Sequence, residues 1–438
     1  MLVKKAFIPF LIVSAALLSA CSSFQSLEPQ EDTYIAIVQP ASVALEETGA
    51  AVAPLGSYLG PADLSSEVQA FYATVDALAQ DYGLATENVT ALGSLRAMVI
   101  TGLTPARAEE LAQDPRVYSL TRDRAVSALR GGPPSGGDDL EEQVVPWGIE
   151  RIGATTTTAK GAGVAAYVVD TGIKVGHEDL GNYVSSDGFS VTDCRGSSCA
   201  APWDDDNGHG THVAGTIGAV DNDLGVIGVA PQVELYAVKV LNNNGSGSIS
   251  GIITGIEWVI DHDNGGAPKV INMSLGGAGS DDQDGQYCPE TRSTDAFHNV
   301  IQRAVCDYDI TVVVAAGNED ADASTSTPAA YDEVITVSAT TSDDDWPYWS
   351  NYGDDVDIAA PGVDILSTWN DGGYNTISGT SMATPHVTGA AAVVLSAHPD
   401  YSPAEVKAAL LANAEDTSSW TNTSGNPHPE PFLDLRGF

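Results

Sequence analysis

Residues 376–390 are Thr376-Ile-Ser-Gly-Thr-Ser-Met-Ala-Thr-Pro-His-Val-Thr-Gly-Ala390, and the rest of the chain is organised around them. Ser381 follows a glycine-containing turn and precedes a run of small and apolar residues, 383–395, that is typical of a buried helix. We therefore expect Ser381 at a helix N-terminus, where free N–H groups and the helix dipole favour a developing anion. A nucleophile that attacks a carbonyl group needs such a position. A serine N-cap is the far commoner alternative, so a catalytic serine also requires a base elsewhere in the chain.

Three further stretches carry polar residues of catalytic type, and they span Val164–Gly172, Asn207–Thr216 and Val312–Asn318. The first contains a short apolar run that ends at Asp170, and the third ends at Asn318. Buried parallel strands deliver polar residues in this way to the carboxyl edge of a sheet. The second stretch places His209 at the start of another helix of small residues. The sequence thus supplies a carboxylate, an amide and an imidazole that can meet Ser381 at one sheet edge.

Together these four motifs, with the chain order Asp, His, Ser, resemble those of the subtilisin-like serine peptidases. The match extends over roughly residues 147–414, and the segment Pro146–Ile152 is similar to the proteinase K branch. Any one motif would be weak by itself, but chance agreement of all four in order is improbable. The resemblance implies a serine endopeptidase.

The resemblance also implies a role for each polar residue. Ser381 is the nucleophile, and His209 is the base that takes its proton and later protonates the leaving amine. Asp170 holds the tautomer of His209. The amide of Asn318 donates to the oxyanion together with the backbone N–H of Ser381. His212 is the competing base, but the family pattern assigns catalysis to the first histidine of His-Gly-Thr-His.

The composition is ordinary in apolar content and unusual in charge. The 438 residues are 43% hydrophobic, but 18 Lys+Arg stand against 59 Asp+Glu, which gives a net charge of −41 and a pI near 4.1. This balance argues against nucleic acid as a partner. The acidic residues are spread along the chain, which indicates either a high-salt setting, a need for bound cations, or simply a soluble acidic surface.

The N-terminal residues 1–20 are predicted to be a signal peptide, with Lys4 and Lys5 before an apolar run from 6 to 18. The following Leu-Ser-Ala-Cys resembles a bacterial lipobox, which implies a lipid on Cys21 and attachment to the membrane, with sorting to the outer membrane. An ordinary signal peptide with a stray cysteine is the alternative. The protein is expected to be exported, either anchored in the cell envelope or secreted after processing.

Residues 31–127 are predicted to form a separate small α+β unit. The expected elements are strands at 34–38, 95–100 and 116–120 and helices at 66–81 and 105–112. This order resembles the ferredoxin-like inhibitory propeptide of the peptidase family, with an unrelated binding domain as the alternative. Residues 128–145 form a Gly/Pro-rich and then acidic linker, in which we expect the maturation cleavage between Ser127 and Val145.

Residues 146–438 alternate apolar strands with helices, which predicts a doubly wound, mostly parallel α/β sheet with helices on both faces. The expected strands span 163–169, 234–240, 270–273, 311–315, 334–338 and 357–359. The expected helices span 209–219, 249–261, 295–307, 382–397 and 402–412.

Substrate must lie extended beside Ser381, and adding a strand to an exposed edge is the simplest way to hold it. Two small-residue segments match the family's substrate-binding edges; they contain Gly245, Ser246 and Gly247, and Ser274, Leu275 and Gly276. Flexible loops are the alternative for both. We expect broad cleavage of protein substrates after apolar or aromatic residues.

A structural calcium ion is implied by the resemblance. Asp357 stands where proteinase K-like relatives place a calcium carboxylate, and the carbonyls of Asp332 and Val334 would complete part of the site. Asp204–Asp206 is a weaker candidate. Solvated acidic side chains are the alternative for both.

Five cysteines are present, and lipidation of Cys21 would leave four in an exported protein. Three pairings are possible, and the short separations favour Cys194–Cys199 and Cys288–Cys306. The second bond would pin an acidic insertion, residues 279–290, which departs from the family pattern.

The main hypothesis is therefore a secreted serine endopeptidase that is made as a precursor inhibited by its own propeptide. Two alternatives remain open. The acidic insertion could narrow the cleft of a dedicated processing protease, or the scaffold could be a catalytically dead surface binding protein.

Overall fold

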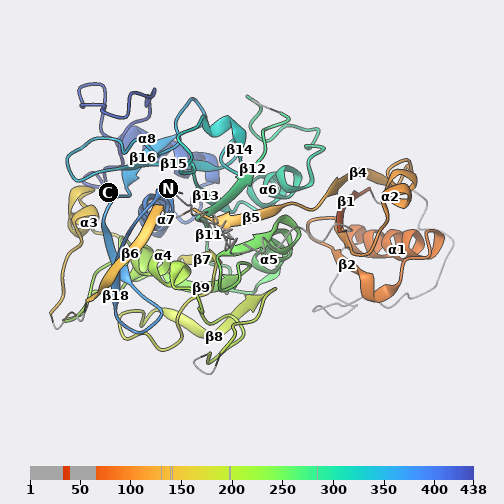
Figure 1. Cartoon of the computed structure of the whole chain (residues 1–438), viewed down its shortest axis with the longest axis horizontal. Helices are drawn as coiled ribbons and strands as arrows, with labels where there is room; N and C mark the ends of the chain where they lie inside the picture. The colour runs from red at the N-terminus through yellow and green to blue at the C-terminus, as the bar shows by residue number, and fades with distance from the viewer. Residues whose placement is uncertain are drawn as a thin grey trace, which may run out of the picture.

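The computed structural model describes residues 33–39, 66–129, 131–138, 140, 142–196, 199–283 and 285–438. The predicted signal peptide and Cys21 lie outside these residues. Within the described part of the chain, no helix has the length and apolar character needed to cross a bilayer. Figure 1 shows a large α/β body and a small unit beside it, joined by strand β5 (Ala125–Ala128), which runs from the small unit into the large one.

The large body is built on a seven-stranded sheet whose neighbouring strands are all parallel, in the order β16-β15-β13-β11-β7-β9-β8. Its strands are β7 (Ala165–Asp170), β8 (Tyr183–Ser190), β9 (Glu234–Lys239), β11 (Lys269–Met273), β13 (Thr311–Ala315), β15 (Ile335–Thr340) and β16 (Ile358–Pro361). The predicted doubly wound α/β fold is confirmed.

Helices cover both faces of this sheet, and the alternation along β7 shows why. Ala166 and Val168 pack in one core with helices α4 (His209–Gly218) and α7 (Thr380–Ala397). Tyr167 and Val169 pack in a second core with α5 (Ile249–Asp261) and α6 (Ala296–Cys306). Every residue of β7 is buried, as expected for a central strand covered on both sides. Helices α3 (Trp147–Arg151) and α8 (Pro403–Asn413) complete the body.

The small unit is an antiparallel four-stranded sheet with two helices, in the strand order β2-β3-β1-β4. Its elements are β1 (Tyr34–Val38), α1 (Ser66–Asp81), β2 (Val89–Leu92), β3 (Ala97–Ile100), α2 (Pro105–Leu111) and β4 (Val117–Arg122). This β-α-β-β-α-β order is ferredoxin-like, and it contains one strand, β2, that the sequence did not predict. Ile35 and Leu95 of this unit belong to the same core as α5 and α6, so the unit is packed against the body through apolar contact.

Two further strands, β5 and β6, follow the small unit in the chain and pair with strands of the large body. Strand β5 lies between β10 (Ser246–Ser248) and β12 (Leu275–Ala278), which continues to β14 (Ser326–Thr327). Strand β6 (Gly131–Asp138) pairs with β18 (Tyr374–Ser378), which pairs with β17 (Ile365–Thr368). The segment that follows the small unit thus pairs twice with the body: β5 pairs with β10 and β12, and β6 pairs with β18.

Candidate active site

The carboxyl edge of the parallel sheet brings Asp170 and His209 together. Asp170 is the last residue of β7, and His209 is the first residue of α4. The Nδ1 atom of His209 lies 2.8 Å and 2.9 Å from the two carboxylate oxygens of Asp170, and both side chains are fully buried. Because the carboxylate faces Nδ1, it fixes a ring in which Nδ1 carries the proton and Nε2 is free to act as a base.

The start of α4 is locked to the end of β7 by its small residues. A Cβ atom on Gly210 would lie 2.2 Å from the carbonyl oxygen of Gly172, so only glycine allows this approach. The buried carboxylate of Asp205 accepts hydrogen bonds from the hydroxyl of Thr171 and the backbone N–H of Gly208. These contacts hold the helix that carries His209 against the strand that carries Asp170.

Ser381 lies in the first turn of α7, as predicted, and faces a carbonyl group of its own chain. Its Oγ makes a short contact with the carbonyl oxygen of Leu129, and its backbone N–H donates to the same oxygen at 3.3 Å. The Oγ atom of Ser381 also lies 3.0 Å from the carbonyl oxygen of Ser274. Within the described residues Nε2 of His209 has no hydrogen-bond partner, so the hydrogen bond between Ser381 and His209 is not formed in this structure.

Asn318 follows β13 and is oriented by the helix that carries Ser381. Its Oδ1 accepts hydrogen bonds from the backbone N–H and the hydroxyl of Thr380, at 2.9 and 3.0 Å. Its Nδ2 is enclosed and has no partner among the described residues. A buried amide nitrogen without an acceptor is costly unless it serves an acceptor that forms transiently, as an oxyanion does.

The two predicted substrate-binding edges are brought together around β5. Ser127 lies opposite Ser246 on one side and Gly276 on the other, and Val126 lies opposite Gly247. Further hydrogen bonds run from Ala128 N–H to Gly245 O at 2.9 Å and from Leu129 N–H to Ser274 O at 3.2 Å, and Leu275 pairs with Ala128. The chain's own residues 125–129 thus lie extended between both edges, with backbone contacts throughout.

Side chains of this segment also indicate two apolar subsites. Val126 is buried in the core that contains Leu275 and α5. A Cβ atom on Gly276 would lie 3.2 Å from a methyl carbon of Leu129, so the absence of a side chain at position 276 leaves room for the leucine.

His212 is excluded as the base by its surroundings. Its Nε2 lies 2.9 Å from the carbonyl oxygen of Ile365 and 3.2 Å from that of Asn375, so the ring donates to backbone. Burial lowers the pKa of His212 to about 3. The ring is therefore a neutral structural element of α4.

The predicted calcium ligands converge, but on a lysine side chain. The Nζ of Lys407, from α8, lies 2.7 Å from Oδ1 of Asp357, 2.8 Å from the carbonyl oxygen of Val334 and 3.4 Å from that of Asp332. An ammonium group therefore stands where the sequence predicted a divalent cation. Calcium binding at Asp357, Asp332 and Val334 stays a prediction, and in this structure the three oxygens share the ammonium of Lys407.

The weaker calcium candidate, Asp204–Asp206, is likewise satisfied by the protein. Asp204 accepts from the backbone N–H of Val175, and Asp206 pairs with the buried ammonium of Lys239 at 2.8 Å. Lys239 lies directly opposite Asp170 in the pairing of β9 with β7 and also donates to Thr171 O. Sequence reasoning missed Lys239, because nothing in its strand shows that the side chain turns toward the site.

More generally, each lysine in the described part of the chain donates inward and is buried or half-buried. Lys269 donates to three backbone carbonyls at the end of α5, and Lys160 donates to two near the start of the body. Lys174 approaches Asp204 at 3.5 Å. Burial lowers the pKa values of Lys160 and Lys269. These lysines act as internal counter-charges in an acidic protein.

The favoured cysteine pairs are both present as disulfides. One joins Cys194 to Cys199, and the other joins Cys288 to Cys306. The second connects the acidic insertion, residues 279–290, to the C-terminal end of α6. Disulfides fit a protein that leaves the reducing cytosol.

The parallel sheet carries a buried Asp–His pair at its carboxyl edge, and a serine lies in the first turn of a helix packed on the same sheet, which are features expected of a serine hydrolase. Comparison with known proteins then shows that the chain belongs to the subtilase family, whose model matches residues 161–429. Members of this family are serine endopeptidases, so the chain is a subtilisin-like serine endopeptidase that acts on proteins.

Several relatives support this assignment. The chain is 39% identical over 447 residues to the extracellular serine proteinase of Thermus sp. (strain Rt41A), with 97% of this chain and 98% of the relative covered. It is 40% identical to alkaline serine exoprotease A of Vibrio alginolyticus, covering 75% of this chain and 57% of that longer relative. Subtilisin E of Bacillus subtilis is 44% identical over 70% of this chain and 72% of its own length.

A solved structure agrees with these sequence matches. A cold-adapted subtilisin-like serine proteinase matches with a TM-score of 0.55 and 38% identity, covering 66% of this chain and 97% of that structure.

Proposed function

We propose that the chain is the autoinhibited precursor of an exported serine endopeptidase, with Asp170, His209 and Ser381 as its triad. Residues 31–129 are its inhibitory propeptide, and the enzyme itself cleaves the bond between Leu129 and Arg130. The observation that carries this proposal is the carbonyl of Leu129, which receives both the hydroxyl and the backbone N–H of Ser381.

The chemistry follows from the positions of the side chains. For the reaction, the hydroxyl of Ser381 turns from the carbonyl oxygen of Leu129 to Nε2 of His209, which takes its proton as Oγ adds to the carbonyl carbon of Leu129. The carbonyl oxygen becomes an anion that the backbone N–H of Ser381 and the free Nδ2 of Asn318 stabilise. Protonated His209 then donates to the leaving amine of Arg130, and water releases Leu129 from the acyl-enzyme by the same steps.

The same contacts explain inhibition before and after cleavage. Residues 125–129 pair with both edges of the cleft, and the small unit is packed on α5 and α6, so no substrate strand can enter until both have left. Affinity through backbone pairing implies limited sequence preference, with apolar residues favoured at the positions of Leu129 and Val126.

The cleavage site is tested by mass spectrometry of the purified protein. Wild-type precursor should yield a new N-terminus at Arg130, and the Ser381→Ala variant should stay intact. Replacing Leu129 with Asp should slow cleavage strongly, whereas Gln143→Ala, further along the linker, should not. Cleavage of Ser381→Ala at the same bond and rate would contradict self-processing, and lack of Ser381 labelling by a phosphonyl fluoride in mature protein would contradict the triad.

The alternative of a dedicated processing protease has one specific observation in its favour. The acidic insertion begins directly after β12, one of the two edges that hold residues 125–129. Cleavage of an unbiased peptide library decides: many products after apolar residues support the broad protease, and a single sequence class supports the dedicated one.

The proposal also includes anchoring of the precursor through a lipid on Cys21. One relative is named an extracellular proteinase, and together with the two disulfides this supports export, whereas the lipobox-like sequence supports the anchor. Expression in a Gram-negative host should place wild-type precursor in the membrane fraction and Cys21→Ala in the soluble fraction. If wild type and Cys21→Ala distribute equally between the two fractions, the lipid anchor is contradicted and the protein is secreted without one.

A further inference from the structure

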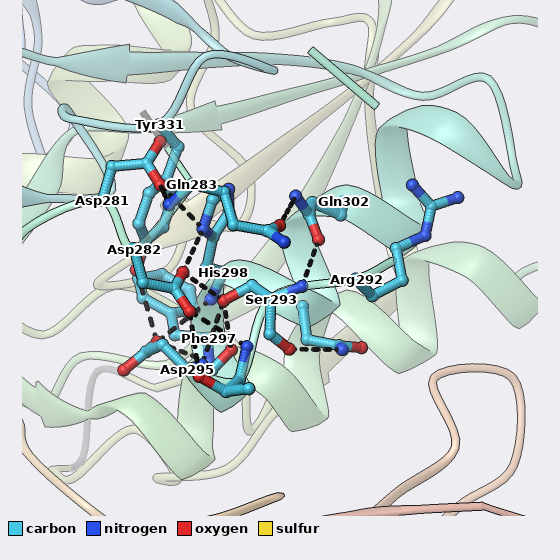
Figure 2. Close-up of polar contacts among 12 residues, drawn as sticks. Asp281, Asp282, Gln283, Arg292, Ser293, Asp295, Phe297, His298, Gln302 and Tyr331 are labelled. Carbon is cyan, nitrogen blue, oxygen red and sulfur yellow. Dashed lines mark hydrogen bonds and ion pairs between the residues drawn. The ribbon is translucent and has the colours of Figure 1, made fainter. Parts of the chain in front are cut away.

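A buried histidine outside the active site faces two carboxylates from the acidic insertion. His298 lies in the first turn of α6, and its side chain is 1% exposed. Its Nδ1 lies 3.0 Å from Oδ1 of Asp282 and 3.3 Å from Oδ1 of Asp281. Figure 2 shows the three side chains converging between the insertion and the helix. One nitrogen and two carboxylate oxygens thus lie within 4.8 Å of one another.

The contact of Nε2 on the opposite side of the ring determines whether Nδ1 of His298 carries a proton or a lone pair. Nε2 of His298 lies 2.9 Å from Oε2 of Glu333, whose side chain is fully buried. A neutral imidazole has one N–H, and if Glu333 receives it, Nδ1 presents a lone pair to two carboxylates. A cation at Nδ1 removes this conflict. A carboxylate behind a histidine is also the usual arrangement behind a metal-bound imidazole.

An unsatisfied oxygen provides a second, independent indication. The side chain of Asp281 is 5% exposed, and its Oδ2 is enclosed without a hydrogen-bond partner among the described residues. Buried carboxylate oxygens normally have a donor or a cation. The neighbouring Asp282 has partners on both oxygens, from Ser293 and Thr294, so it is already held in place.

The spacing of the three atoms suits a single ion. Two ligands at about 2.0–2.2 Å from one zinc ion in tetrahedral geometry lie about 3.3–3.5 Å apart, close to the N–O separations found here. An imidazole with two carboxylates favours a transition ion over Ca²⁺, which prefers oxygen ligands alone. The ring is also fixed in plane, because Tyr331 stacks on it at 4.1 Å and 3°.

We propose that Asp281, Asp282 and His298 bind a divalent transition-metal ion, with Zn²⁺ as the best match. The ion fastens the acidic insertion to α6 at one end, while the disulfide Cys288–Cys306 fastens it at the other. Since the insertion starts directly after β12, the ion also stiffens the edge that holds a substrate strand. The site does not depend on the proposed triad.

Zinc binding is measured on the full-length Ser381→Ala precursor, which does not digest itself and in which His209 is buried. Isothermal titration with Zn²⁺ should give one site, and Co²⁺ should produce visible absorption bands of a nitrogen- and oxygen-ligated ion. Zn²⁺ should raise Tm by a few degrees. Asp281→Asn should lower the affinity about 10-fold or more, and Glu333→Gln about 10–100-fold.

Asp332→Asn is the matched control, because it removes the same charge from a neighbouring carboxylate that accepts a hydrogen bond from the backbone N–H of Gln286 and lies outside the three-residue cluster. It should bind Zn²⁺ like the parent. His298→Gln should abolish the cobalt bands, and its circular dichroism spectrum shows whether it folds. Absence of Zn²⁺ binding to the parent, or equal affinity in Asp281→Asn and Asp332→Asn, would overturn the proposal and leave a protonated His298 as the only cation of the cluster.

Discussion

Replacing Lys407 by methionine tests whether a side-chain ammonium takes the place of a structural cation. Methionine keeps most of the apolar stem but removes the charge. The carboxylate of Asp357 and the carbonyls of Val334 and Asp332 would then face one another without a cation. Burial already raises the pKa of Asp357, and Lys407 opposes that rise.

The expected loss of stability follows from the exposure of the pair. Removing one partner of a buried ion pair costs about 3–5 kcal/mol. Here the side chains of Lys407 and Asp357 remain 20% and 19% exposed, so we expect a smaller loss of about 2–3 kcal/mol. At about 2 °C per kcal/mol for a domain of this size, Tm should fall by about 4–6 °C.

The assay compares thermal unfolding in EDTA and in calcium, using the Ser381→Ala background at one scan rate. The parent should be insensitive to calcium at this site. In Lys407→Met, calcium should restore part of the lost Tm, and adding Asp357→Asn should abolish that response. Lys160→Met is a control, because Lys160 also donates to two carbonyls but is not part of this cluster. Unchanged Tm in Lys407→Met, or a calcium response of the parent that Asp357→Asn removes, would refute the reasoning.

Three other predictions concern catalysis, maturation and the insertion. Asn318→Ala should lower kcat by about 10²–10³-fold with little change in KM, the range known for such a donor in a subtilisin, and steady-state kinetics of mature enzyme would show it. The carboxyl of Glu257 on α5 accepts hydrogen bonds from the backbone N–H groups of Ser94 and Leu95 in the small unit, and burial raises its pKa to about 8. The complex with the propeptide therefore favours the protonated carboxyl. Affinity for the propeptide should be highest below the ordinary pKa of a glutamate and should fall as pH rises toward 8. The lag before activity should therefore shorten at least several-fold between pH 5 and pH 8, and Glu257→Gln should flatten this dependence. Replacing Cys288 and Cys306 by serine should cost about 3 kcal/mol and make the insertion sensitive to limited proteolysis; an unchanged digestion pattern would contradict the pinning role.

The sheet and the positions of the candidate catalytic residues were predictable because the signals are local. Strands such as β13 are unbroken apolar runs, and its predicted bounds, 311–315, match the structure. Asp170 is the last residue of β7 and Asn318 lies three residues after the end of β13, so their place at the sheet edge follows from these strands. Strand β8 (Tyr183–Ser190) was missed because it lies at the sheet edge and contains Ser, Asp and Gly, which resemble a loop. Strand β2 (Val89–Leu92) was missed because it is only four residues long.

The residues that contact the predicted calcium ligands and fill the substrate cleft could not be predicted, because they come from distant segments of the chain. Lys407 lies on a helix more than forty residues after Asp357, and nothing nearby shows that its side chain points inward. Cleavage in the linker was predicted from the sequence, but the bond that we propose, after Leu129, follows from the register of residues 125–128 between β10 and β12. Sequence patterns show which residues form a helix or a strand. Which side chains of distant elements come into contact can be read only from the folded structure.

The inward direction of the described lysines has a consequence for the outside of the molecule. Reagents that modify amines, and proteases that cut after lysine, would find few reactive targets on the folded body. Coupling to a support or a dye through amine chemistry should therefore be inefficient, and carboxyl-directed chemistry would be the better choice for labelling or immobilising this enzyme.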